Sequence, residues 1–171
     1  MKSLPLEALI ASAFITYLTS EPENVRAETL RKWSDLLEFN ESFDVLRFLT
    51  TQSELLQFKQ EGLASDELSL QNAQAILHSM QYSYIIDPTS NAIRWLSNHL
   101  ESREIIAWQD EKLLNQLELS VRFGKTIVIT EMDTAEPLLY PILRRDIARQ
   151  GIVPSHNLNF SFQIFLKEFC V

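Results

Sequence analysis

The tripeptide Gly124-Lys125-Thr126 matches the last three positions of GxxxxGK[ST], a loop that holds nucleotide phosphates. In such a loop the backbone amides surround the phosphates, the lysine contacts the outer ones, and a helix begins directly afterwards. One hypothesis is therefore a nucleotide site in which Lys125, Thr126 and Glu131 act together.

The surroundings of this tripeptide do not fit a phosphate-binding loop. The first glycine of the motif falls on Leu119, and the hydrophobic pattern predicts a helix before Gly124 and a strand after Lys125. A glycine in this place commonly ends a helix, and a neighbouring lysine is favoured by the negative end of the helix dipole. We therefore interpret Gly124 as a helix stop that leads into a buried strand.

A phosphate-binding loop is expected instead after the first predicted strand, at DPTSNAIRWL (87–96). On the motif, Asp87 and Ala92 take the two glycine positions, Ile93 takes the lysine and Arg94 the hydroxyl residue. The candidate loop comprises Asp87, Pro88, Thr89, Ser90, Asn91, Ala92, Ile93 and Arg94. The order of strand, turn and helix suits a nucleotide site, but the residue types do not. Two interpretations stay open: a turn initiated by proline, or a degenerate nucleotide loop.

The run IVITEMD resembles a strand that ends in magnesium-binding and water-orienting acids, but its chemistry is incomplete. Thr130 stands where an aspartate would hold magnesium, and Glu131 stands where an acid would orient water. Because nothing upstream supplies a phosphate-binding cation, we interpret Glu131 as the polar end of a strand. We predict no catalytic residue in this chain.

Helical patterns fill residues 1–62. One apolar stripe, expected to face the core, consists of Leu6, Leu9, Ile10, Ala13, Phe14, Tyr17 and Leu18. Pro22 suits the start of a second helix, which continues through Trp33. Thr51 opens the capping box TQSE of a third helix, and Gly62 ends that helix. A fourth helix is predicted at 69–80.

After this helical part, strands alternate with helices. The predicted strands are 82–86, 103–108, 126–130 and 160–166, and a helix with its C-terminal end near Arg149 precedes the last of them. This alternation is typical of an α/β fold with a parallel sheet flanked by helices, here preceded by an all-helical segment. We predict a division of the chain into 1–62 and 63–171.

Composition argues against several classes of partner. The net charge of −8 disfavours nucleic acid and anionic membrane surfaces. Cys170 is the single cysteine and the three histidines are far apart, so we expect no disulfide and no metal site. The stretch ALIASAFITYL is about half the length needed to span a bilayer, which favours a cytoplasmic protein without membrane insertion.

Several stretches, in order, resemble the fifth AAA+ module of dynein heavy chains. They are GLASDELSLQNA, YIIDPTSNAIRWL, LELSVRFGKTIVITEMD and EPLLYPILRRDIARQG. The earlier LPLEALIASAFITYL and VRAETLRKW resemble the segment that joins the stalk base to that module. The sequences of these stretches are most similar to those of the cytoplasmic dyneins of retrograde intraflagellar transport. The fold class that this implies is a partial, P-loop-NTPase-like AAA+ large subdomain.

The resemblance implies a ring of six modules that uses ATP to move towards microtubule minus ends. It implies that this fifth module neither binds nor hydrolyses nucleotide, needs no cofactor, and relays ring motion, while ATP and magnesium act in other modules. Implied partners are the neighbouring modules, the stalk and its supporting coiled coil, dynein subunits and microtubules. The implied location is the cytoplasm, the cytoskeleton and the cilium or axoneme.

Three further expectations concern the C-terminal part and the alternatives. Arg144 and Arg145 are either helix-end charges or residues that reach a nucleotide in the preceding module. The end of the chain departs from the family pattern, so we expect a truncated module in which 160–166 fills the gap between the first and third strands. A generic helical interaction module is the alternative, although the stripe with Phe14, Tyr17 and Trp33 is expected to be core.

Overall fold

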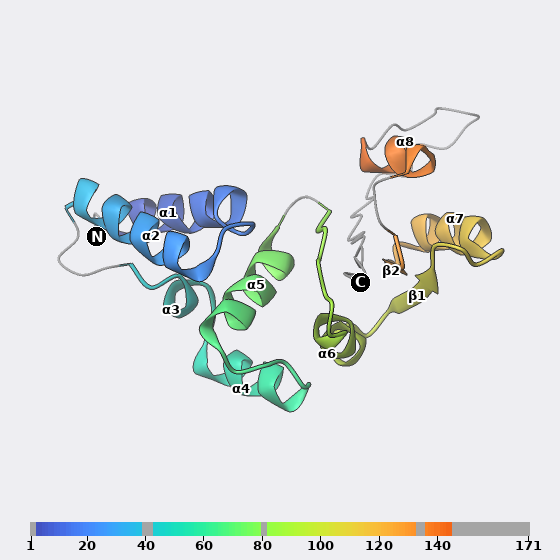
Figure 1. Ribbon diagram of the computed structural model, residues 1–171, viewed down its shortest axis with the longest axis horizontal. Helices are drawn as coiled ribbons and strands as arrows, with labels where there is room; N and C mark the ends of the chain where they lie inside the picture. Colours follow the sequence, from blue (N-terminus) through green and yellow to red (C-terminus); the bar gives the residue numbers. More distant parts are fainter. Residues whose placement is uncertain (1–2, 39–42, 80–81, 133–135, 145–171) are drawn as a thin grey trace. The chain divides into compact units, whose positions relative to one another are not determined.

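The computed structural model describes residues 3–38, 43–79, 82–132 and 136–144. They belong to two compact units, Met1–Met80 and Gln81–Val171. Helices build the first unit, and helices alternate with strands in the second (Figure 1). The predicted order, an all-helical segment followed by an α/β part, is confirmed.

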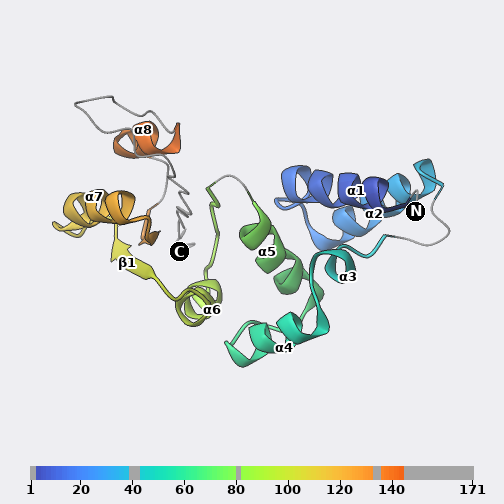
Figure 2. The same cartoon turned by 180° about the vertical axis from the view of Figure 1, so that it is seen from behind.

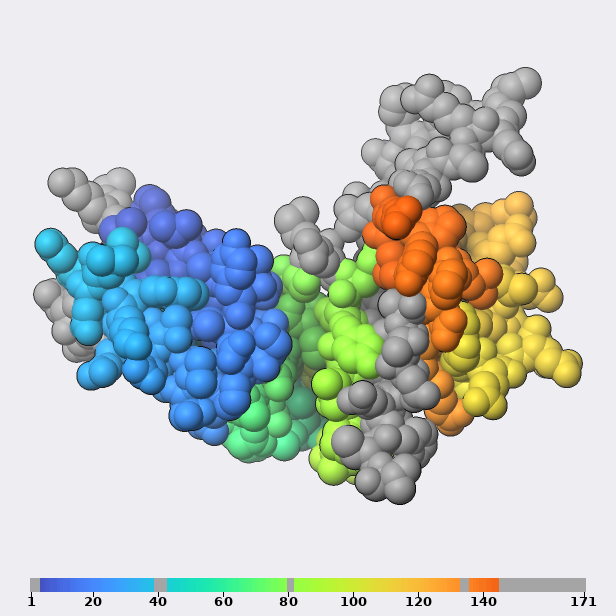
Figure 3. All heavy atoms as spheres, turned by 45° about the horizontal axis from the view of Figure 1, so that its top comes forward, coloured from blue at the N-terminus to red at the C-terminus, as the bar shows by residue number. Residues whose placement is uncertain are grey.

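The described helices of the first unit are visible from two sides in Figures 1 and 2. They are α1 (Ser3–Tyr17), α2 (Glu23–Leu36), α3 (Val45–Leu49), α4 (Gln52–Gln60) and α5 (Glu67–His78). Ile10, Phe14 and Leu18 form a core with Leu30 and Val45. In the space-filling view the atoms of α1 and α2 form one continuous body (Figure 3).

The predicted core stripe of α1 is only partly correct. Ile10 and Phe14 are buried, but Leu9 and Tyr17 are 57% and 70% exposed. Helix α1 packs against α2 and α3. The face of α1 that is buried by these helices is narrower than the apolar stripe in its sequence. Tyr17 is therefore outside the core of this unit, whereas the partly buried Trp33 packs against it.

Local sequence signals set the ends of α4 as predicted. The Thr51 hydroxyl accepts from the backbone N–H of Glu54, and the Glu54 carboxylate accepts from the backbone N–H of Thr51. Gly62 follows the helix with φ +97°, a left-handed conformation that glycine adopts without steric cost. The amides of Gly62 and Leu63 donate to the carbonyls of Lys59 and Phe58, which closes a Schellman motif.

The second unit contains a parallel β–α–β arrangement. Its described elements are α6 (Asn91–His99), β1 (Arg103–Ala107), α7 (Leu113–Phe123), β2 (Thr126–Thr130), the 3-10 helix η1 (Pro137–Leu139) and α8 (Tyr140–Leu143). Strands β1 and β2 pair in parallel, with Arg103 opposite Thr126 and Ala107 opposite Thr130. Parallel strands need a crossover connection, and α7 provides it.

The centre of β2 is buried on both faces, as its continuous apolar sequence predicts. Ile127, Val128 and Ile129 have no solvent exposure. The core of this unit also contains Ile106, Leu113, Leu117, Met132 and Leu139. The strand is thus the buried element on which the rest of the unit packs.

One predicted strand is absent, and the start of one predicted helix is wrong. Residues 82–86 are not a strand: the described chain from 82 to 87 has neither helical nor strand assignment. A strand requires a ladder of hydrogen bonds to a neighbour, and alternation in the sequence cannot provide that neighbour. The fourth helix begins at Glu67 rather than 69, because Asp66 accepts a hydrogen bond from the Ser69 amide and caps it there.

Two predictions on organisation concern the division of the chain and its last strand. Helix α5 packs with α3, so the first compact unit continues to Met80, beyond the division that we predicted after Gly62. The predicted strand 160–166 lies outside the described residues. Among the helices that the structure describes, none has the length and apolarity to cross a membrane.

Candidate functional site

The side chain of Asp87 occupies the loop where a phosphate-binding loop was expected. Its Oδ1 accepts from the backbone N–H of Asn91 at 3.0 Å and from the Thr89 hydroxyl at 3.4 Å. Its Oδ2 accepts from the backbone N–H of Ile93 at 3.1 Å. The residue is only 6% exposed. Both carboxylate oxygens are therefore engaged at the N-terminal end of α6.

Ser90 gives this loop its shape. Its backbone has φ 60° and ψ 23°, the left-handed region that serine seldom adopts. The Ser90 amide donates to the Asp87 carbonyl at 3.3 Å, and the Ser90 carbonyl accepts from Arg94 at 3.2 Å, where the helix begins. The turn predicted at Pro88 is thus present, with a carboxylate placed over the first turn of the helix.

The remaining residues of the candidate loop do not supply the phosphate-binding lysine of the motif. Ile93 stands at the lysine position of the motif and is apolar, while Arg94 is exposed on the helix. Pro88 and Asn91 are exposed, and Ala92 is half-buried. The loop offers an anion where a nucleotide would need donors and a positive charge.

Helix α6 is held firmly behind this loop. Trp95 and Leu96 are each 1% exposed. The ring of Trp95 stacks on His99 with centroids 5.2 Å apart. These buried side chains anchor the helix whose first amides bind the Asp87 carboxylate.

The Gly124-Lys125-Thr126 tripeptide joins a helix to a strand, as we interpreted it. Gly124 has φ +64° and caps α7, and the Lys125 amide donates to the Ser120 carbonyl at 2.9 Å. Strand β2 begins at the next residue, Thr126. A phosphate-binding loop follows a strand and precedes a helix, whereas this turn follows a helix and precedes a strand.

The ammonium group of Lys125 has a partner on the neighbouring strand. Its Nζ lies 2.7 Å from Oε1 of Glu104, and the two side chains are 41% and 34% exposed. Glu104 is opposite Ile127 in the parallel register, so the ion pair spans β1 and the start of β2. The sequence did not reveal this partner, because the two residues are far apart in the chain.

The two positions of the predicted acidic strand end lie at the end of β2. The Thr130 hydroxyl is 3.5 Å from the Ile106 carbonyl, at the limit of a hydrogen bond. Glu131 is exposed and has φ 60°, which turns the chain as it leaves the strand. Among the described residues, the hydrogen bonds of Asp87 and Ile93 do not involve Thr130 or Glu131. In the described part of the chain, therefore, no hydrogen bond links the Asp87 carboxylate to this strand end.

Only one of the two candidate arginines is described. Arg144 follows α8, is exposed, and holds its guanidinium 5.7 Å from the centre of the Tyr140 ring. This is a cation–π contact within one short segment. Arg145 lies outside the described residues, so neither interpretation of the pair is decided.

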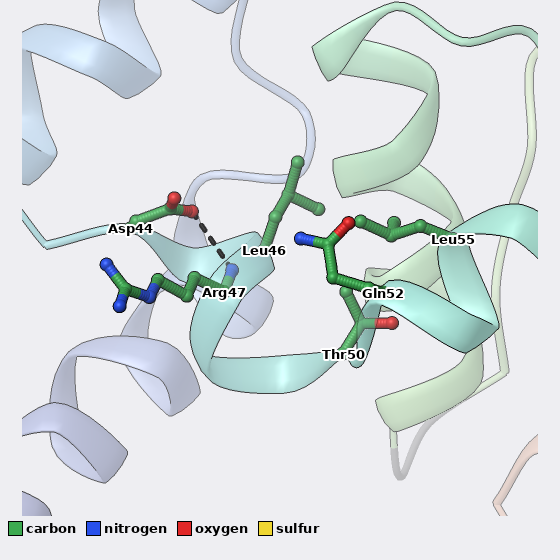
Figure 4. A pocket seen from close by; sticks show the side chains of 6 residues that line it. All are labelled: Asp44, Leu46, Arg47, Thr50, Gln52 and Leu55. Atoms are coloured by element: carbon green, nitrogen blue, oxygen red, sulfur yellow. Dashed lines mark hydrogen bonds between the residues drawn. The ribbon is translucent and has the colours of Figure 1, made fainter.

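A surface hollow in the first unit was checked as an alternative site (Figure 4). It is lined by Asp44, Leu46, Arg47, Thr50, Gln52 and Leu55. The Asp44 carboxylate accepts from the Arg47 amide at 3.0 Å, which caps the short helix α3. This interaction is structural: it caps a helix, and it engages one oxygen of the carboxylate that lines the hollow.

Sequence reasoning missed one buried charge, Arg26. This residue is 3% exposed and donates to the carbonyls of Glu21 at 2.7 Å and Thr19 at 2.6 Å. It also lies 3.4 Å from Oε1 of Gln71 and 5.8 Å from the Phe14 ring centre. Burial lowers the pKa of Arg26, and the charges of Glu21 and Glu23 act in the opposite direction.

A parallel β–α–β unit, together with a helix that begins at a capped turn, is consistent with a partial AAA+ α/β domain. The family model of the ATP-binding dynein motor region matches residues 56–166. The chain therefore belongs to the dynein heavy-chain family.

Relatives with high similarity are heavy chains of one dynein class. Cytoplasmic dynein 2 heavy chain 1 of Homo sapiens is 50% identical over 153 residues, and that of Mus musculus is 49% identical over 153 residues. The Chlamydomonas reinhardtii protein of the same name is 49% identical over 156 residues. Each alignment covers 88% of this chain and 4% of the relative.

Proposed function

We propose that this chain forms a structural AAA+ module of a dynein heavy chain, one that neither binds nor hydrolyses nucleotide. The observation that carries the proposal is the loop before α6. There the Asp87 carboxylate binds the amides of Asn91 and Ile93, and an isoleucine replaces the phosphate-binding lysine. An ATP phosphate at this place would meet the negative charge of Asp87 without the lysine that phosphate-binding loops provide.

The proposed place of the module is the fifth position of the motor ring, with the first unit as the lead-in from the stalk base. Its neighbours, the stalk and its supporting coiled coil are the proposed direct partners. The mechanical role is to transmit ring motion as a packed body.

The proposed motor is the cytoplasmic dynein of retrograde intraflagellar transport, acting on microtubules in the cytoplasm and cilium. Support comes from the relatives, which are named as cytoplasmic dynein 2 heavy chains. ATP and magnesium would serve other modules of the motor. We propose no cofactor for this one.

A titration of the purified chain with fluorescent ATP and magnesium tests the absence of nucleotide binding. We expect no saturable signal up to about 1 mM, the upper end of common substrate affinities. Lys125→Ala should behave like the wild type, because Lys125 pairs with Glu104. Lys112→Ala is the matched control, since Lys112 is also a lysine at the edge of α7.

The result that would overturn the proposal is micromolar ATP binding that Lys125→Ala removes and Lys112→Ala retains. That outcome would restore the hypothesis of a working site with Lys125, Thr126 and Glu131.

A further inference from the structure

The N-terminal end of α6 is capped in an unusual way. The first amides of a helix have no partner within the helix, and the side chain of the N-cap residue commonly accepts from one of them. Here the N-cap residue is Ser90, in the left-handed region, and its side chain makes no capping bond. The acceptor is Asp87, three residues earlier in the chain.

The arrangement of the Asp87 carboxylate is the one expected of a bound anion. Its two oxygens take separate amides, those of the first and third helical residues, Asn91 and Ile93. Helix N-termini favour negative charge because of the free N–H groups and the helix dipole. Ile93 is at the lysine position of the phosphate-loop motif, so its amide is one of those that would surround a phosphate.

We propose that Asp87 is a built-in anion that takes the place of a nucleotide phosphate and holds the loop before α6 in one conformation. This inference rests on the proposed function as a non-binding module, and it adds the residue and the physical cause. A free phosphate cannot compete, because the carboxylate is part of the chain and is already buried at 6% exposure.

This built-in anion has a mechanical consequence. In a working site the loop and its helix can change with the state of the phosphate, which differs before and after hydrolysis. Here the carboxylate is permanent, and Trp95 and Leu96 anchor the same helix in the core. The loop and α6 should therefore stay ordered at every stage of a cycle that takes place elsewhere.

Amide hydrogen exchange on the full chain tests this inference, read at Asn91 and Ile93. Hydrogen bonds to a charged group are strong enough that Asp87→Ala should speed exchange of these amides about ten- to a hundredfold. Asp87→Asn, which keeps one acceptor oxygen, should give an intermediate increase. Thr89→Ala removes only the 3.4 Å contact and should change exchange by less than about threefold.

The amides of Ile127 and Ile129 in β2 report whether a variant is still folded. If Asp87→Ala loses their protection as well, the comparison is made with Asp87→Asn. Unchanged exchange at Asn91 and Ile93 in a folded Asp87 variant would contradict the built-in anion, even if the wild type binds no ATP. Saturable protection of these amides by ATP in the wild type would instead contradict the proposed function.

Discussion

Two charged residues support the proposal that this chain binds no nucleotide. Lys125 is paired with Glu104, and Asp87 is bound to backbone amides at the start of α6. Both side chains therefore make contacts within the second unit. Lys125, the lysine of the apparent motif, is therefore not part of the loop at Asp87, and that loop has an isoleucine at the lysine position.

Arg26 is a buried charge whose replacement should destabilise the first unit. Its guanidinium reaches two carbonyl groups from one planar fork, and a lysine ammonium cannot reproduce that geometry. We expect Arg26→Lys to lower the free energy of unfolding by about 2–4 kcal/mol, because buried donors and acceptors lose their partners. Denaturant unfolding measures the loss.

Arg31→Lys is the matched control for Arg26→Lys, since Arg31 is exposed on the same helix. It should change stability by less than about 0.5 kcal/mol. Equal effects of the two substitutions would show that the buried fork of Arg26 is not important for stability.

Two helix ends, those of α4 and α7, are set by glycines in the left-handed region. Gly62 has φ +97° and Gly124 has φ +64°, with no atom close enough to exclude a β-carbon. We expect Gly62→Ala and Gly124→Ala each to cost about 1–2 kcal/mol through backbone strain alone. Thermal unfolding of each variant measures the cost.

Asparagine tolerates the left-handed region better than alanine does, which provides a control. Gly124→Asn should therefore be more stable than Gly124→Ala. The strain argument fails at Gly124 if the alanine variant is the more stable of the two.

The start of α5 should make stability depend on pH. The hydrogen bond from the Ser69 amide lowers the pKa of Asp66 below its ordinary 3.8. A carboxyl with a lowered folded-state pKa stabilises the fold above the unfolded value, and the effect is lost as pH falls through the folded value. We expect the loss on going from about pH 6 to about pH 2 to be up to about 1 kcal/mol.

Asp66→Ser isolates this effect, because serine also caps helices but does not titrate. Stability measured over the same pH range should fall less in Asp66→Ser than in the wild type. Parallel curves for the two proteins would rule out Asp66 as the titrating cap.

The molecule consists of two packing units, each with its own core. Phe14 is fully buried in the first core and Ile127 in the second. Phe14→Ala and Ile127→Ala should each cost about 2–5 kcal/mol through the cavity left behind. Hydrogen exchange should show the main loss of protection in α1 and α2 for the first variant, and in β1 and β2 for the second.

Leu36→Ala is the control for these two core variants, since Leu36 is 79% exposed and should change stability by less than about 0.5 kcal/mol. Equal loss of protection in both units after either core substitution would contradict the division into two cores.

Features that depend on neighbours in the chain were predictable from the sequence. The capping box at Thr51, the helix stops at Gly62 and Gly124, and the buried strand Thr126–Thr130 all follow from residue type and local order. Local backbone preference and short-range hydrogen bonds cause them, so a single sequence contains the information. The family also became visible at this level, through several motifs in order.

Features that depend on contacts between distant residues appeared only in the folded chain. The partner of Lys125 is 21 residues away, Arg26 is buried against Gln71 on another helix, and residues 82–86 are not a strand. The sequence left two interpretations open for the loop at Asp87, because its spacing does not show which amides the carboxylate reaches. The amides of Asn91 and Ile93 are only four and six residues away, but the sequence does not specify the loop conformation, with Ser90 in the left-handed region, in which the carboxylate reaches them.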